Sequence, residues 1–127
     1  MKKTFYKGAQ GNLSLHVVTV SLAALAVSGT KVLSDRLPIG TEVTGIRVIS
    51  GALGLNTALK VDLVDAAATV TPVLPSTVTV AAVNKFVAVK PIYIGDNGVS
   101  DLVLTNSGTG AATGEVTIQL EYRFKGY

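Results

Sequence analysis

Residues 114–127, GEVTIQLEYRFKGY, decide the fold of this chain. Apolar side chains alternate with polar ones over about ten positions of this stretch. The apolar set is Val116, Ile118, Leu120, Tyr122 and Phe124. In an extended chain these side chains share one face, whereas a helix would spread them around its circumference. The pattern therefore predicts a central β-strand, and we expect the rest of the chain to cover its apolar face.

Other segments also have the composition of strands. Residues 13–22 are rich in β-branched side chains, and a similar character recurs at 43–49, 57–64, 86–94 and 99–105. These segments are separated by Gly, Pro, Asn and Ser, the residues that favour turns. They predict a chain built almost entirely from short strands.

The segment 57–64, TALKVDLV, alternates cleanly between apolar and polar positions. A Gly-rich connection, 51–56, separates it from 43–49, so we expect these two segments to pair as antiparallel neighbours. The inward set is then Leu59, Val61 and Leu63, and the outward set is Lys60, Asp62 and Val64.

Prolines restrict where several strands can lie. Pro72 and Pro75 lie between the short β-like pieces 69–71 and 78–80, and they exclude a central strand there because proline cannot donate a ladder hydrogen bond. An edge or a crossover is expected instead. By the same argument Pro91 places 86–94 at a sheet edge or a bulge.

Turn signals divide the remaining chain. Pro38 with Gly40 predicts a turn, and Asp96-Asn97-Gly98 predicts another because Asn and Gly tolerate positive φ. Residues 23–27 precede the turn-like Ser28-Gly29-Thr30 and are expected to form either a second strand or a bend.

The resulting pattern is about eight short strands, spaced roughly eight to twelve residues apart, with no convincing helix. It predicts an all-β fold, an antiparallel β-sandwich of jelly-roll or immunoglobulin-like topology. The chain has no Trp and no Cys, which removes the usual immunoglobulin markers and favours the jelly roll. We expect one β-sandwich domain over 13–127, preceded by an extended, flexible basic N-terminal arm over 1–12.

Composition limits how this domain is held together. A chain of 127 residues suits one domain, and without cysteine it relies on packing, within itself or against neighbours. Charged residues make up 15% and apolar residues 48%, which is little charge for a small soluble monomer. Either the chain is docked against other subunits, or its outer faces use Thr and Ser in place of charge.

The arm carries most of the charge asymmetry. The net charge is +3, and the arm provides Lys2, Lys3 and Lys7, with Phe5 and Tyr6 as apolar anchors between them. Such an arm can reach an acidic partner surface, or it can simply keep the terminus soluble. It lacks the Arg density of a nucleic-acid interface, so no nucleic-acid partner is expected. These five residues are our candidate contacts to a protein partner.

The run 17–27 follows Lys2 and Lys3 and could be mistaken for a secretory signal. Polar residues interrupt it, and a polar spacer precedes it, so we favour strands and keep a signal peptide as the alternative. The run is too short and too polar for a transmembrane helix, and no membrane partner is expected.

Candidate catalytic residues are scarce. His16 is the single histidine and lies among apolar neighbours, and the sequence offers no nucleophile and orienting carboxylate to accompany it. A lone histidine is also a poor transition-metal site. The Gly-rich loops 51–54 and 107–114 lack the Gly-Lys-Ser/Thr ending of a phosphate loop. We therefore expect no enzyme activity, no catalytic residue and no cofactor.

One set of oxygen-bearing side chains is a candidate cation site. One loop brings together oxygen-bearing side chains that could hold Ca²⁺, namely Asp96, Asn97, Ser100 and Asp101. Their spacing does not match an EF-hand, and turn geometry accounts for the same residues, so a turn is favoured over calcium. A solvated rim is expected for four further carboxylates, namely Asp35, Glu42, Asp62 and Asp65.

Four stretches resemble a group of small tailed-phage virion proteins. They are the turn 37–41 (LPIGT), the strand 43–54 (VTGIRVISGALG), the strand 57–65 (TALKVDLVD) and the closing 112–127 (ATGEVTIQLEYRFKGY). The chain resembles, over 36–127, the jelly-roll decoration (cement) proteins that sit on the outside of an assembled head. Fibre and tail-associated phage sandwiches share the pattern.

This resemblance implies a homodimer or homotrimer that is made in the host cytoplasm and binds the major capsid protein on the capsid exterior. There it would close gaps between capsomers and resist internal DNA pressure. The alternatives are a tail or fibre-associated module and a carbohydrate-binding jelly roll, for which Tyr93 and Tyr127 are the candidate aromatic platforms.

Overall fold

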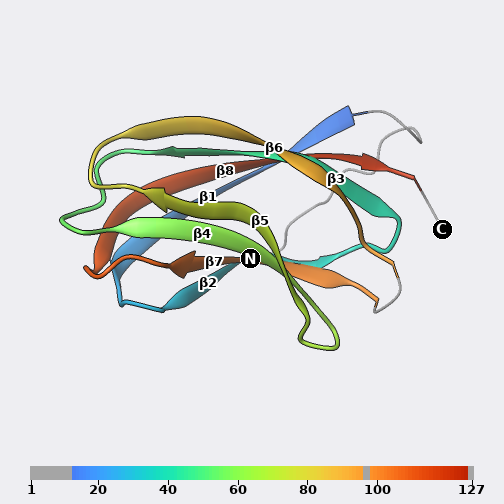
Figure 1. Ribbon diagram of the computed structural model, residues 1–127, viewed down its shortest axis with the longest axis horizontal. Helices are drawn as coiled ribbons and strands as arrows, with labels where there is room; N and C mark the ends of the chain where they lie inside the picture. The colour runs from blue at the N-terminus through green and yellow to red at the C-terminus, as the bar shows by residue number, and fades with distance from the viewer. Residues whose placement is uncertain (1–12, 96–97, 126–127) are drawn as a thin grey trace.

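Two antiparallel sheets of four strands each face each other across the core (Figure 1). This computed structural model describes residues 13–95 and 98–125, and within these ranges the regular elements are all strands. The strands are β1 (Leu13–Leu25), β2 (Thr30–Leu37), β3 (Thr41–Ser50), β4 (Ala58–Asp65), β5 (Val70–Val78), β6 (Val83–Tyr93), β7 (Ser100–Asn106) and β8 (Ala112–Phe124). The arm 1–12 and the turn residues Asp96 and Asn97 lie outside the described residues.

The strand order identifies the topology. The first sheet has the order β1-β8-β3-β6 and the second has the order β2-β7-β4-β5, so the chain crosses between the sheets at every connection except β4 to β5. Eight strands wound between two sheets in this order form a jelly roll. The predicted fold class is confirmed.

The strand β8 occupies the central position that its alternation predicted. It pairs with β1 on one side and with β3 on the other. Its side chains at Val116, Ile118, Leu120 and Tyr122 have no solvent-exposed surface, and the polar residues between them are partly exposed. The apolar half of the pattern thus supplies the middle of the core.

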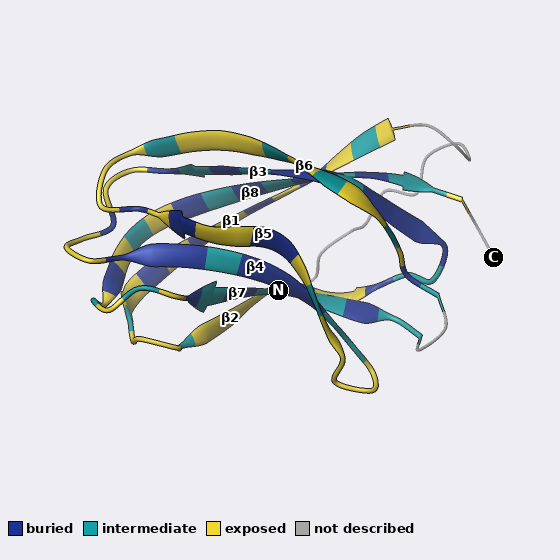
Figure 2. Ribbon diagram, in the orientation of Figure 1, coloured by how far each residue is buried: buried dark blue, intermediate teal, exposed yellow. Residues whose placement is uncertain are grey.

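The core lies between the two inner faces. The first sheet contributes fully buried side chains such as Ile46 and Leu120, and the second contributes Leu59, Leu102 and Leu104. Figure 2 shows β4 largely buried, whereas the edge strand β6 is largely exposed. Edge strands are therefore where side chains remain available for partners.

One predicted pairing is wrong. The segments 43–49 and 57–64 became β3 and β4, which lie in different sheets. Both sides of β3 are already occupied, by β6 and β8. The Gly-rich connection between β3 and β4 instead bridges the sandwich, since Leu53 N donates to Thr79 O and Leu53 O accepts from Thr113 N. Alternation reveals which face of a strand is buried but not which strand lies beside it.

Other boundaries also differ from expectation. The first strand continues to Leu25 through a bulge, where Ala24 has a φ of 51°, so residues 23–27 form no separate strand. The strand β2 was not predicted, and the two short pieces around the prolines are one strand, β5. Its edge position confirms the proline argument. Pro91 likewise lies in an edge strand, next to a register shift opposite Val43 and Gly45.

Candidate binding surface

His16 has a structural position. Its side chain is buried, and Nε2 lies 3.1 Å from Oγ of Ser34 on β2. The contact joins the first sheet to the second across the sandwich interior, which satisfies a buried polar atom. The geometry assigns the only histidine to fold stabilisation.

The candidate calcium loop is only partly described, since Asp96 and Asn97 lie outside the described residues. Ser100 is buried, and Asp101 Oδ1 accepts a hydrogen bond of 3.0 Å from the backbone N–H of Arg36. Asp101 thus fixes β2 against β7. Within 13–95 and 98–125, no group of three or more acidic or histidine side chains is arranged to hold a metal ion.

Four carboxylates were expected to be solvated, and this prediction is correct for Asp35 but wrong for Asp62 and Glu42. Asp35 is exposed, whereas Asp62 and Glu42 are only 7% and 8% exposed. Asp62 lies on a central strand between β5 and β7, and its Oδ2 is 3.8 Å from Nζ of Lys60. Position within the sheet, which periodicity does not reveal, explains this burial. Asp65 caps a turn by accepting from the N–H groups of Ala67 and Thr69.

Glu42 forms the shortest ion pair among the described residues. Its Oε1 accepts from Nε of Arg123 at 2.6 Å, and Nζ of Lys125 lies 3.5 Å from Oε2. The hydrogen bond from Arg123 holds the pKa of Glu42 below its ordinary value; burial opposes this, and the charge of Lys125 adds to it. This ion-pair cluster joins β3 to β8 at one end of the first sheet.

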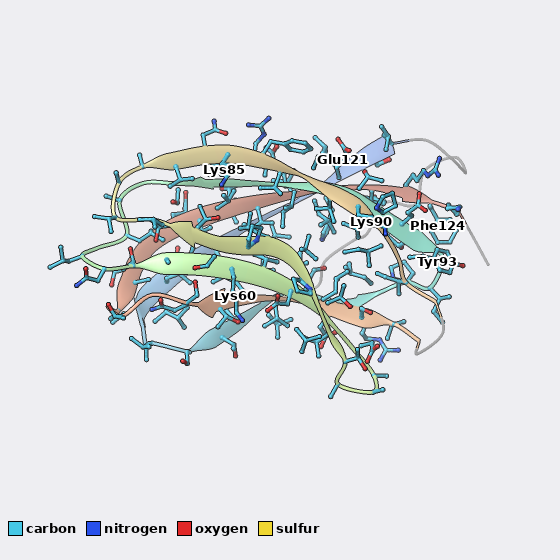
Figure 3. All side chains as sticks on the ribbon, in the orientation of Figure 1. Lys60, Lys85, Lys90, Tyr93, Glu121 and Phe124 are labelled. Carbon is cyan, nitrogen blue, oxygen red and sulfur yellow. The ribbon has the colours of Figure 1, made fainter. Side chains whose placement is uncertain are left out.

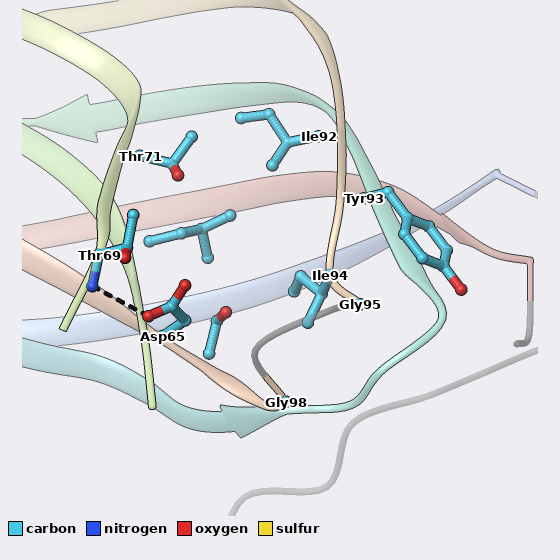
Figure 4. Close-up of a pocket in the computed structure, with 10 residues that line it drawn as sticks. Asp65, Thr69, Thr71, Ile92, Tyr93, Ile94, Gly95 and Gly98 are labelled. Carbon is cyan, nitrogen blue, oxygen red and sulfur yellow. Dashed lines mark hydrogen bonds between the residues drawn. The ribbon is translucent and has the colours of Figure 1, made fainter. Parts of the chain in front are cut away.

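A pocket of about 240 Å³ opens between the β4–β5 hairpin and the end of β6 (Figure 4). Asp65, Thr69, Thr71 and Ile94 line it, and the amide of Thr69 donates to the Asp65 carboxylate. The described lining contains no histidine, lysine or arginine that would activate a hydroxyl.

Tyr93, one of the two candidate sugar platforms, is half exposed. Its ring packs against Gly95, where a Cβ would lie 2.5 Å from a ring carbon, so part of the ring is already covered. In Figure 4 the ring projects from the β6 trace, away from the labelled polar groups of the pocket. The second candidate, Tyr127, lies outside the described residues.

The outer face of the first sheet is the most distinctive surface of the described chain. On β1 it exposes Leu13, Leu15 and Val17, whose side chains are 63%, 57% and 54% exposed. The alternate residues of β1, such as Val18 and Val20, point into the core. Because these three outward side chains follow one another along one strand, they form a continuous apolar row, hereafter the β1 row.

Beside the β1 row lies a shallow hollow of about 180 Å³ on the same face. Its lining combines apolar, aromatic and charged groups, namely Leu15, Arg47, Phe86, Gln119 and Glu121. These residues come from all four strands of the first sheet: β1, β3, β6 and β8. Figure 3 labels Glu121 on the central strand β8 of this face.

The side chains of the hollow are held in place by one another. The Arg47 guanidinium lies 5.6 Å from the centre of the Phe86 ring, a cation–π distance, and Nη1 donates to Asn84 Oδ1 at 2.8 Å. The ring lies over Gly45, where a Cβ would come within 2.5 Å of it. Thr44 donates to Glu121 Oε1 at 2.8 Å. The hollow is thus preorganised.

This surface was not predicted from the sequence. Leu13, Leu15 and Val17 were expected to belong to a strand, but no exposed face was assigned to them, and no role was predicted for Arg47 and Phe86. An available signal was the absence of charge from 13–25, since the outward positions of a solvated edge strand normally carry charge. The five arm residues Lys2, Lys3, Phe5, Tyr6 and Lys7 lie outside the described residues.

Comparison with known proteins places the fold among virus structures. No family model and no curated protein matches the chain. Several solved structures are similar in three dimensions, and two of them are phage capsids. One, titled the capsid of Ralstonia phage GP4, has a TM-score of 0.75 and 16% identity over 99% of this chain and 92% of that chain.

The other, titled the capsid asymmetric unit of cyanophage Pam1, has a TM-score of 0.66 and 16% identity over 98% of this chain and 93% of that chain. At these identities the likeness establishes a shared fold. It also extends over nearly the whole of each chain, so each of the two similar chains consists of little besides this fold. No helix in the described part of our chain is long and apolar enough to span a membrane.

Proposed function

We propose that this chain is a non-enzymatic structural protein of a phage virion, a decoration (cement) protein that binds the outer surface of the head and stabilises it. The observation that carries the proposal is the likeness, at TM-scores of 0.75 and 0.66, to chains of two phage capsids. The match covers more than nine-tenths of each of those chains, so the shared fold is not limited to one part of a larger protein.

The outer face of the first sheet supports a role in binding protein. Interfaces are enriched in aromatic residues and arginine and are centred on apolar side chains, and this face combines Phe86, Arg47 and the β1 row. A preorganised hollow loses little conformational entropy on binding. We propose that this face docks onto the major capsid protein.

The arm adds a second contact in this proposal. Lys2, Lys3 and Lys7 would meet acidic groups of the capsid, and Phe5 and Tyr6 would enter apolar depressions on it. A short segment that becomes ordered on binding loses entropy but extends the contact beyond one flat face.

A decoration role suits the chain better than a shell-forming role. A subunit of the shell needs contacts around its whole perimeter, whereas the outer face of the first sheet brings the β1 row, Phe86 and Arg47 together on one side of the chain. In this proposal the protein is made in the host cytoplasm, assembles as a homodimer or homotrimer and then joins the exterior of the finished head.

The direct test is co-sedimentation of the purified chain with capsids of the phage that encodes it, prepared without the protein. Saturable pelleting at a fixed ratio to the major capsid protein, together with greater resistance of the heads to heat, is the expected result. A chain that stays in the supernatant at all concentrations contradicts the proposal, and binding to isolated tails instead would favour a tail module. Phe86→Ser and Arg47→Glu should reduce pelleting, whereas Val78→Ser, on the second sheet, should not.

A further inference from the structure

Three of the four sheet edges carry features that hinder pairing with another strand. The edge strand β6 contains Lys85, Lys90 and Pro91, and both lysines project from it in Figure 3. The edge strand β5 contains Pro72 and Pro75 and two register shifts opposite β4. Proline, lysine and bulges are the devices by which proteins block edge-to-edge association.

The edge of β2 is blocked in a different way. It carries Lys31, Asp35 and Arg36, and its register with β7 shifts twice within eight residues. Arg36 also has a φ of 57°, which interrupts the extended backbone that a new partner strand would need. A strand from another chain would find no regular ladder here.

The edge of β1 has none of these protections from Leu13 to Leu22, and its one bulge lies beyond this stretch, between Leu22 and Leu25. Its sequence, LSLHVVTVSLAAL, has no proline, lysine, arginine or carboxylate over thirteen residues. From Leu13 to Leu22 it pairs with β8 without a register shift, so its backbone is regular. In a regular antiparallel strand half of the backbone N–H and C=O groups point to each side, and β8 is the neighbour on one side of β1 in the part of the chain that the structure describes.

We propose that β1 pairs with the β1 strand of a second copy of this chain, antiparallel, across a two-fold axis perpendicular to the first sheet. The axis lies at Val17, near the middle of the regular stretch, so that Val17 faces the partner's Val17 and Leu15 faces the partner's Thr19. The two first sheets then form one sheet of eight strands. This inference rests on the homo-oligomer in the proposed function and names its interface, and it can fail while binding to a capsid holds.

The partner strand at the β1 edge is a second copy of β1, because two copies of this strand are compatible in charge. The strand carries no carboxylate, lysine or arginine, so two copies meet without repulsion between like charges. The nearest charges on this face, Glu115, Glu121 and Arg123, belong to β8, and two copies of β8 would be three strand spacings apart, roughly 14 Å. At physiological ionic strength that exceeds the screening length of about 8 Å.

The same geometry explains why assembly would stop at two chains. Among the four sheet edges that the structure describes, pairing through β1 uses the one without these protections, and the outer edges of the joined sheet are then the blocked β6 strands. A two-fold interface of this kind closes on itself. The two outer faces become continuous, so a capsid partner would meet both hollows and both β1 rows side by side.

The test measures mass as a function of concentration, by sedimentation equilibrium of the full chain. The wild type is expected to be a dimer. The double variant Leu15→Lys/Val17→Lys, which places like charges across the axis, should raise the dimer dissociation constant by about 100-fold or more. Val78→Lys, a matched change at an exposed position of β5, should leave it unchanged. A wild-type monomer, a trimer, or a double variant that remains dimeric overturns the proposal.

A second experiment tests the register. Because the chain has no cysteine, a single introduced thiol reports on one contact alone. Val17→Cys should form a disulfide-linked dimer under mild oxidation, since opposed residues in an antiparallel pair have their Cβ atoms about 5 Å apart, within reach of a disulfide. Val78→Cys should remain monomeric on a non-reducing gel. Equal cross-linking of the two variants would contradict pairing at β1.

Discussion

Nε of Arg123 lies 2.6 Å from Oε1 of Glu42, a contact that joins the two central strands of the first sheet, β8 and β3. The carboxylate is buried and Arg123 is partly exposed. A charged group in this position depends on its partner, because burial alone would favour the neutral acid. The pair therefore makes the stability of the sheet sensitive to pH.

Acid should destabilise the protein through Glu42. The pKa of Glu42 in the folded protein is lowered from an ordinary value of 4.5, so its ionised form contributes stability above that value. The contribution should disappear as the pH falls through the lowered pKa. Urea unfolding between pH 7 and pH 3 is expected to show a smaller loss of stability for Glu42→Gln than for the wild type, from a lower starting value at pH 7. The exposed Glu115→Gln serves as a control and should follow the wild type.

Asn106 should be among the polar residues that matter most for stability. Its Nδ2 donates to Leu25 O at 2.9 Å and to Gly110 O at 2.8 Å, and its Oδ1 accepts from Gly108 N. At about 1 kcal/mol for each hydrogen bond, Asn106→Ala should reduce the free energy of unfolding by roughly 3 kcal/mol. The exposed Asn84→Ala, which removes one bond to Arg47, should cost less than about 1 kcal/mol. Equal losses for the two variants would contradict this interpretation.

Gly45 and Phe86 should be energetically coupled. A methyl group at position 45 would collide with the Phe86 ring, so Gly45→Ala should destabilise the wild type. In a Phe86→Ala background the same change should be neutral or stabilising, since glycine weakens a strand interior. The double-mutant cycle is expected to give a coupling energy of about 0.5–3 kcal/mol. Simple additivity would show that the ring does not depend on the glycine.

Deleting residues 1–12 tests the proposed arm. Capsid occupancy should fall while the melting temperature of the sandwich changes little, because the two sheets bury their inner faces against each other. Replacing Phe5 and Tyr6 by serine separates the apolar anchors from the lysines. Unchanged occupancy after the deletion would leave the outer face of the first sheet as the proposed contact.

The fold could be predicted from the sequence where a residue pattern is compatible with only one kind of local structure. The alternation from Val116 to Tyr122 identified the central strand, and Pro72 and Pro91 correctly marked edges. Strand neighbours were harder to predict, because β3 and β4 follow each other in the chain but belong to opposite sheets. The strand β2 was missed since its apolar positions are interrupted by a bulge and by charge.

The candidate site could be predicted only in small part. The burial of Glu42 depends on Arg123, 81 positions away, and no local pattern records such a pairing. The hollow gathers one or two residues from each of four strands, so it exists only once the jelly roll has formed. The lack of charge along β1, by contrast, was visible in the sequence, and its meaning became clear once β1 was known to lie at an edge.

The position of β8 has a consequence for how the protein is made. Leu13 pairs with Arg123. Because the chain is synthesised from its N-terminus, β1 cannot pair with β8 until almost the whole chain has been translated. The strand β7 likewise enters the middle of the second sheet late, between β2 and β4. Nascent chains that stop before these strands lack the centre of both sheets, and long-range pairing of this kind folds slowly. Incomplete chains therefore cannot present the outer face of the first sheet, and any partner of that face would meet only finished chains.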